Sequence, residues 1–146
     1  MGELTNDEST WTTPVPATEE DEIVLGREYV PALCSSFVYE REGGKMEVYL
    51  SDSEGVHRFI ADNVLPSGGL VENKAGTVST GARLQLSNYL RYLEQNGGSL
   101  DYNFFRSPVS GAFGPTPQFA AMLKHASRKH KVRVHYYEHD WWEELQ

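Results

Sequence analysis

The connections between its predicted strands constrain the fold of this chain more than any other feature. Three strand-like stretches lie close together and are separated by turn sequences, whereas the later ones are separated by helix-forming segments. Strands joined by a short turn pair antiparallel, and strands joined by a helix can pair parallel. We therefore expect an α/β domain with a mixed central sheet flanked by helices.

The individual elements follow from apolar periodicity and from turn residues. The chain predicts a helix near 22–30 that bends or ends at Pro31, strands at 45–51, 56–64 and 70–75, a helix at 80–96, a strand at 100–106, a Gly/Pro loop at 107–115, a helix that starts at Pro117 after a Thr116 cap, and a strand at 132–137. The expected order is α-β-β-β-α-β-α-β.

Charge is distributed unevenly along the chain, whose net charge is −8. Residues 1–25 hold seven acidic and no basic residues, and residues 138–146 hold four acidic and no basic residues. All 13 Lys and Arg lie between these ends, so the body is mildly basic and compatible with a phosphate-bearing partner. We expect a flexible acidic leader or linker at 1–21, a folded domain at 22–138 and an acidic tail at 139–146.

Several classes of protein are disfavoured by composition. No apolar run approaches the roughly 18 residues of a transmembrane helix, and the acidic start lacks the basic and apolar regions of a signal peptide. Cys34 is the single cysteine, which excludes an internal disulfide and a multi-cysteine zinc site.

Asp62, Glu72 and Lys74 form the most informative constellation. Glu72 and Lys74 are two residues apart on one predicted strand, so they share a face, and the turn at 66–69 can bring Asp62 beside Glu72. Paired carboxylates bind a hard cation such as Mg²⁺, and an ammonium group can stabilise charge that develops on a phosphate. By spacing alone, a solvated or salt-bridged sheet edge explains the pattern better than a catalytic site does.

The stretch from Arg58 to Gly76, with its Asp, hairpin turn and Glu-x-Lys, resembles the core of the PD-(D/E)xK, or restriction-endonuclease-like, nucleases. The next helix adds Gln85-Leu-Ser-Asn-Tyr89, which is similar to the Q-x-x-x-Y motif of several branches of that superfamily. Together with residues 101–107 and 114–119, the pattern resembles the restriction-endonuclease-fold toxin domains of bacterial polymorphic toxins. The resemblance covers roughly residues 57–137.

This resemblance implies a restriction-endonuclease-like core and an Mg²⁺- or Mn²⁺-dependent endonuclease that cleaves DNA more often than RNA. It implies that Asp62, Glu72 and the backbone carbonyl of Asn73 bind the metal, that Lys74 and Gln85 act with Asp62 and Glu72 in catalysis, and that Glu28 or Glu40 of the first helix can add a carboxylate. We expect Tyr89 and the basic residues Lys124, Arg128, Lys129 and Lys131 to contact the nucleic acid. The implied biology is a secreted or delivered effector that acts in a target-cell cytoplasm and is blocked by a cognate immunity protein.

Asn73 departs from the family pattern, because the middle residue of Glu-x-Lys is usually apolar and buried. A buried amide without partners costs about 1–3 kcal/mol, so either this face is partly open or Asn73 has specific partners. Two further interpretations stay open: a catalytically inactive member of the same fold that binds nucleic acid or protein, and an unrelated acidic interaction protein. Trp141 and Trp142 either pack on the body or bind a partner.

Overall fold

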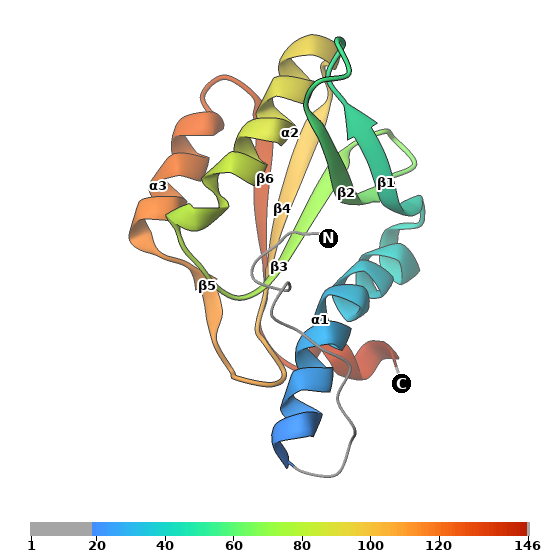
Figure 1. Ribbon diagram of the computed structural model, residues 1–146, viewed down its shortest axis with the longest axis vertical. Coiled ribbons are helices and arrows are strands. Elements are labelled where there is room, and N and C mark those ends of the chain that lie inside the picture. The colour runs from blue at the N-terminus through green and yellow to red at the C-terminus, as the bar shows by residue number, and fades with distance from the viewer. Residues whose placement is uncertain (1–18, 146) are drawn as a thin grey trace.

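The computed structural model describes residues 19–145 (Figure 1). The leader expected at 1–21 lies outside the described residues except for its last three, which begin the first helix. The elements are α1 (Glu19–Glu42), β1 (Lys45–Ser51), β2 (Arg58–Val64), β3 (Leu70–Val78), η2 (Thr80–Ala82), α2 (Arg83–Asn96), β4 (Ser99–Phe105), β5 (Phe113–Pro115), α3 (Pro117–Ala126), β6 (Lys131–Tyr137) and η3 (Trp141–Leu145).

The strands form one mixed sheet of six strands. Its order is β1-β2-β3-β4-β6, and β5 pairs with the far end of β3. The hairpin-connected strands β1, β2 and β3 are antiparallel, whereas β4 and β6 follow parallel to β3 across helical connections. The expected α/β fold with a mixed sheet flanked by helices is thereby confirmed.

Helices cover both faces of this sheet (Figure 1). On one face, α2 and α3 bury side chains such as Tyr89 and Phe119 against Tyr102 and Phe104. On the other face, α1 and η3 pack against the sheet around Phe105. Each fully buried apolar side chain contributes about 1.5–3 kcal/mol, so these two layers hold the central strands rigidly between them.

The first helix continues through Pro31, so the expected end at this residue, one of the two alternatives, is wrong. The helix α1 runs from Glu19 to Glu42 with Pro31 inside it. Proline removes one backbone hydrogen bond and costs about 3 kcal/mol. Beyond it, Cys34, Phe37 and Val38 are each at most 3% exposed and pack on the sheet. Their burial offsets the proline, because three such side chains contribute more than one lost bond.

The loop expected at 107–115 contains a short strand that the sequence analysis missed. Residues 113–115 form β5, which runs parallel to Gly76–Val78 at the end of β3. The third strand is accordingly longer than expected and extends from Leu70 to Val78. A three-residue strand has no periodicity of its own, so its formation depends on the neighbouring β3 backbone.

The expected cap of the helix after this loop is confirmed. The hydroxyl of Thr116 accepts a hydrogen bond from the backbone N–H of Phe119, and Pro117 occupies the start of α3. The expected helix at 80–96 begins as a 3₁₀ turn, η2, whose Ser79 cap accepts from Gly81, and then continues as α2 to Asn96. The helix stops at Gly97, which has a positive φ of 73°.

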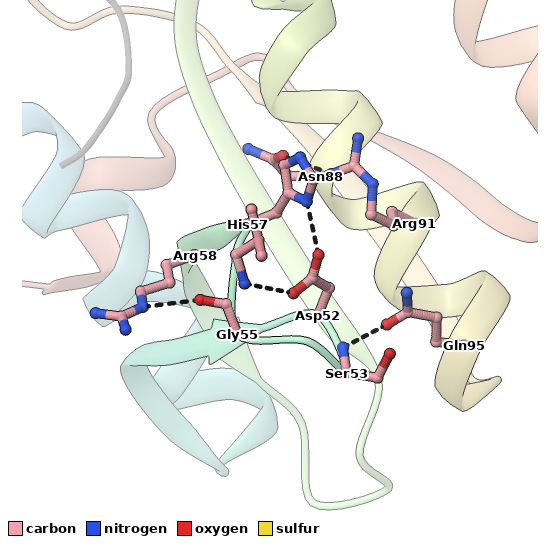
Figure 2. A network of polar contacts seen from close by, with 9 residues as sticks. Asp52, Ser53, Gly55, His57, Arg58, Asn88, Arg91 and Gln95 are labelled. Carbon is pink, nitrogen blue, oxygen red and sulfur yellow. Dashed lines mark hydrogen bonds and ion pairs between the residues drawn. The ribbon is translucent and has the colours of Figure 1, made fainter.

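A polar network attaches the β1–β2 hairpin to α2 (Figure 2). The Asp52 carboxylate accepts from the N–H of Val56 at 2.8 Å and contacts Nδ1 of His57 at 2.6 Å. The backbone N–H of Ser53 donates to Oε1 of Gln95 on α2 at 2.8 Å. The hydrogen bond with His57 lowers the pKa of Asp52 to about 2. The network thus ties the hairpin that carries Asp62 to the helix that carries Tyr89.

The C-terminal segment expected as an acidic tail contains η3. Trp141 is 2% exposed, its Nε1 donates to the carbonyl of Arg106 at 2.8 Å, and its ring lies against Phe37 and Phe105. Of the two interpretations left open for this residue, packing on the body is the one observed. Among residues 19–145, no helix combines the length and the apolar character required to cross a membrane.

Candidate active site

The structure brings Asp62, Glu72 and Lys74 into one cluster. The β2–β3 ladder pairs Asn63 with Val71 and Val64 with Leu70. Where the ladder ends, Oδ2 of Asp62 accepts the backbone N–H of Asn73 at 2.7 Å. On β3, Nζ of Lys74 lies 3.2 Å from Oε2 of Glu72. The geometry therefore juxtaposes two carboxylates and one ammonium group on neighbouring strands.

Burial sets the electrostatics of this cluster. Glu72 is 1% exposed and Lys74 6% exposed, whereas Asp62 is partly exposed. Desolvation raises the pKa of Asp62 well above its ordinary value, and the negative charge of Glu72 raises it further. These effects outweigh the hydrogen bond from Asn73 and the charge of Lys74. The raised pKa of Asp62 favours its protonated form in the absence of a cation, and a bound cation would favour the ionised carboxylate instead.

Tyr89 is a direct partner of Glu72. Its hydroxyl donates to Oε1 of Glu72 at 2.5 Å and lies 3.3 Å from the carbonyl oxygen of Val71. Its side chain is 0% exposed, so the residue expected to contact nucleic acid lies within the core. Gln85, one turn earlier on α2, is partly buried, and within the described residues its side chain forms no hydrogen bond with the cluster.

Asn73 has specific partners. Its Nδ2 donates to Oδ1 of Asn63 at 2.8 Å, and its Oδ1 accepts from Nδ2 of Asn103 at 3.0 Å. Asn63 in turn donates to the carbonyl of Ser35 on α1 at 3.0 Å. A row of three buried asparagines therefore crosses β2, β3 and β4. It accounts for the amide between Glu72 and Lys74, and it holds that part of β3 in register.

Sequence reasoning missed Tyr102, which lies on the same face of the sheet as Glu72. The two residues are register partners on β4 and β3. Tyr102 is 0% exposed, and its hydroxyl has no hydrogen-bond partner among the described residues. A buried hydroxyl without a hydrogen-bond partner lowers the stability of the fold by about 1–3 kcal/mol. The sequence places Tyr102 on a strand, but no local signal indicates that this strand lies next to β3.

The basic stretch is exposed, and its part at the start of β6 lies away from the cluster. The predicted contacts Lys124, Arg128, Lys129 and Lys131 are all exposed, on α3, the following turn and the start of β6. Lys131 lines a hollow of about 780 Å³ together with His130 and Arg133. By register, Lys131 lies three residues before Val134, which is level with Glu72, or about 10 Å along the strand direction. Lys131 therefore does not line the carboxylate cluster, and the four exposed residues can contact a long polyanion.

The donor set of the cluster fits a magnesium-type cation. Mg²⁺ prefers one or two carboxylates and retains several water molecules. Asp62, Glu72 and the carbonyl of Asn73 would hold it. Glu40 is exposed, and the side chain of Glu28 lies outside the described residues. Among the described residues, no group of three or more His, Cys, Asp and Glu side chains is arranged to hold a metal.

Comparisons of the chain with protein-family models, with curated proteins and with solved structures found no match.

Proposed function

We propose that this chain is a metal-dependent endonuclease with a restriction-endonuclease-like core, which hydrolyses phosphodiester bonds of DNA. The observation that carries the proposal is the convergence of Asp62, Glu72 and Lys74 from two neighbouring strands of a mixed sheet. The resemblance of this stretch to the toxin domains of polymorphic toxins extends the proposal to an effector that acts in a target cell and is blocked by an immunity protein.

Each residue of the cluster has a role in this proposal. When bound, a divalent cation polarises the phosphate and lowers the pKa of a coordinated water molecule. Asp62, Glu72 and the Asn73 carbonyl hold the cation, and the hydroxyl of Tyr89 fixes the orientation of the Glu72 carboxylate. Lys74 leaves its ion pair with Glu72 to stabilise the charge that develops on the phosphate. Gln85, which is partly buried on α2, is the remaining residue to which the resemblance gives a catalytic role.

The exposed basic residues supply contacts with the phosphate backbone. Lys124, Arg128, Lys129 and Lys131 carry no catalytic role, so their removal weakens binding and reduces its dependence on salt. Because Lys131 lies about 10 Å along the strand direction from the level of Glu72, it orients a long substrate rather than the scissile bond.

The burial of the cluster favours a second candidate function. Glu72 and Lys74 are almost inaccessible, and only Asp62 is partly exposed, which restricts the access of a macromolecular substrate. This second candidate is a catalytically inactive member of the same fold that binds nucleic acid or protein. In such a protein no substrate has to reach the cluster, so the cluster can be closed.

Plasmid cleavage by the purified chain tests the proposal, with Mg²⁺, Mn²⁺ or EDTA. Asp62→Asn is the most informative variant, because it removes a carboxylate that is proposed to bind the cation and keeps an oxygen that can accept from the backbone N–H of Asn73. We expect it to stay folded and to cleave at least about 100-fold more slowly, a loss near 3 kcal/mol of transition-state stabilisation. Lys74→Met is expected to lose activity to a similar extent.

Matched controls are Glu54→Gln in the exposed β1–β2 turn and Lys45→Ala at the exposed start of β1, and neither should change cleavage. Cleavage that persists in EDTA, or full activity of Asp62→Asn, contradicts the nuclease proposal. A wild-type chain that binds DNA and is protected against heat by Mg²⁺, but never cleaves, identifies the inactive binding module instead.

A further inference from the structure

The hydroxyl of Tyr102 is a buried polar group that the proposed roles leave unused. Its ring is held between aromatic neighbours, with centroid distances of 5.3 Å to Phe104 and 5.5 Å to Phe119. The residue is 0% exposed, and its hydroxyl has no partner in the described part of the chain. The ring is therefore fixed by packing, while its hydroxyl is left without a hydrogen-bond partner among the described residues.

The carboxylate of Glu72, the register partner of Tyr102, is oriented by a partner on each of its oxygens. Oε1 of Glu72 accepts from Tyr89, and Oε2 of Glu72 is the atom that lies nearest Nζ of Lys74. Burial raises the pKa of Tyr102, and the charges of Glu72 and then Asp62 raise it further. The phenol thus stays protonated and neutral, and it keeps both a hydrogen to donate and lone pairs to accept.

We propose that Tyr102 holds a water molecule of the hydrated divalent cation that Asp62 and Glu72 bind. This inference rests on the proposed function and adds an outer partner to the same site. A coordinated water fits this position better than a phosphate group, because Tyr102 is 0% exposed and a single water molecule is much smaller than a phosphate. Mg²⁺ keeps several of its waters in proteins, and groups that hold such outer contacts tune its affinity.

The test is the metal affinity of Tyr102→Phe, which keeps the ring and removes the hydroxyl alone. Thermal unfolding followed against MgCl₂ and MnCl₂ concentration gives the midpoint of metal stabilisation without any need for cleavage. We expect the midpoint to rise about 10-fold in the variant, within the range for lost outer partners. The metal-free variant should unfold at or above the wild-type temperature, because it loses an unpaired polar group.

Tyr137→Phe is the matched control, since Tyr137 packs in the other core against Phe105 and Phe37. It should leave the metal midpoint unchanged. An unchanged midpoint in Tyr102→Phe, while the wild-type chain is stabilised by metal and cleaves DNA, overturns the inference and leaves the nuclease proposal intact. A wild-type chain that no divalent cation stabilises overturns both.

Isothermal titration of Mg²⁺ into folded protein at low temperature provides a second measurement, in case Tyr102→Phe unfolds early on heating. Asp62→Asn should show no binding heat in that experiment, and Tyr102→Phe should show binding that is about 10-fold weaker. Equal affinities of wild type and Tyr102→Phe refute the inference by this route as well.

Discussion

Truncation of the buried asparagines should cost unequal amounts of stability, in an order that follows from their hydrogen bonds. Asn73→Ala deprives two buried partners: Oδ1 of Asn63 loses its donor and Nδ2 of Asn103 loses its acceptor. Asn103→Ala leaves only Oδ1 of Asn73 without its donor. It also removes Oδ1 of Asn103, an atom that has no partner among the described residues.

The expected difference follows from the cost of an unpaired polar atom, about 1–3 kcal/mol each when buried. Asn73→Ala leaves two such atoms, whereas Asn103→Ala creates one and eliminates one. The cavity left by the side chain is similar in both variants, so it cancels in the comparison. We therefore expect Asn73→Ala to be less stable than Asn103→Ala by about 2 kcal/mol or more.

Urea unfolding followed by tryptophan fluorescence measures this difference. With a slope of about 2 kcal/mol per molar for a domain of this size, the two midpoints should differ by about 1 M. Equal midpoints, or a lower midpoint for Asn103→Ala, would refute the reasoning. If Asn73→Ala is too unstable to study, Asn73→Ser, which keeps a small polar group, should still unfold at lower urea than Asn103→Ser.

Three further predictions concern other parts of the molecule. The depressed pKa of Asp52 means that its contribution to stability is complete above about pH 4 and is lost as pH falls through about 2. Between pH 4 and pH 2, the urea midpoint of Asp52→Asn should therefore fall less than the urea midpoint of the wild type. Parallel pH profiles of the two proteins would contradict this prediction. Burial raises the pKa of Cys34, so an aromatic disulfide reagent should modify it at least about 100-fold faster in urea than in the native protein, and rapid native modification would refute its burial. Trp141→Ala should lower the free energy of unfolding by about 3–5 kcal/mol, whereas a loss below 1 kcal/mol would show that the C-terminal segment is not packed on the body.

Local features of the sequence determined most of the elements. The alternation in 45–51 and the Thr116-Pro117 cap each depend on residues within a few positions, and both appear in the structure at the expected places. The spacing of Glu72 and Lys74 also required that both lie on one face of a strand, and their 3.2 Å ion pair agrees with it. Periodicity and capping act through near neighbours, so they can be read without knowledge of the fold.

Tertiary structure alone decided the features that depend on contacts between distant parts of the chain. Pro31 stays within α1 because the side chains after it pack on the sheet, and β5 exists because β3 offers a free backbone edge. The partners of Asn73 are 10 and 30 residues away, and Tyr102 meets Glu72 only because β4 lies beside β3. The sequence indicates which side chains can form hydrogen bonds. Their burial, which makes an unpaired polar atom costly, arises only when the helices pack on the sheet, and this free-energy cost selects the partners.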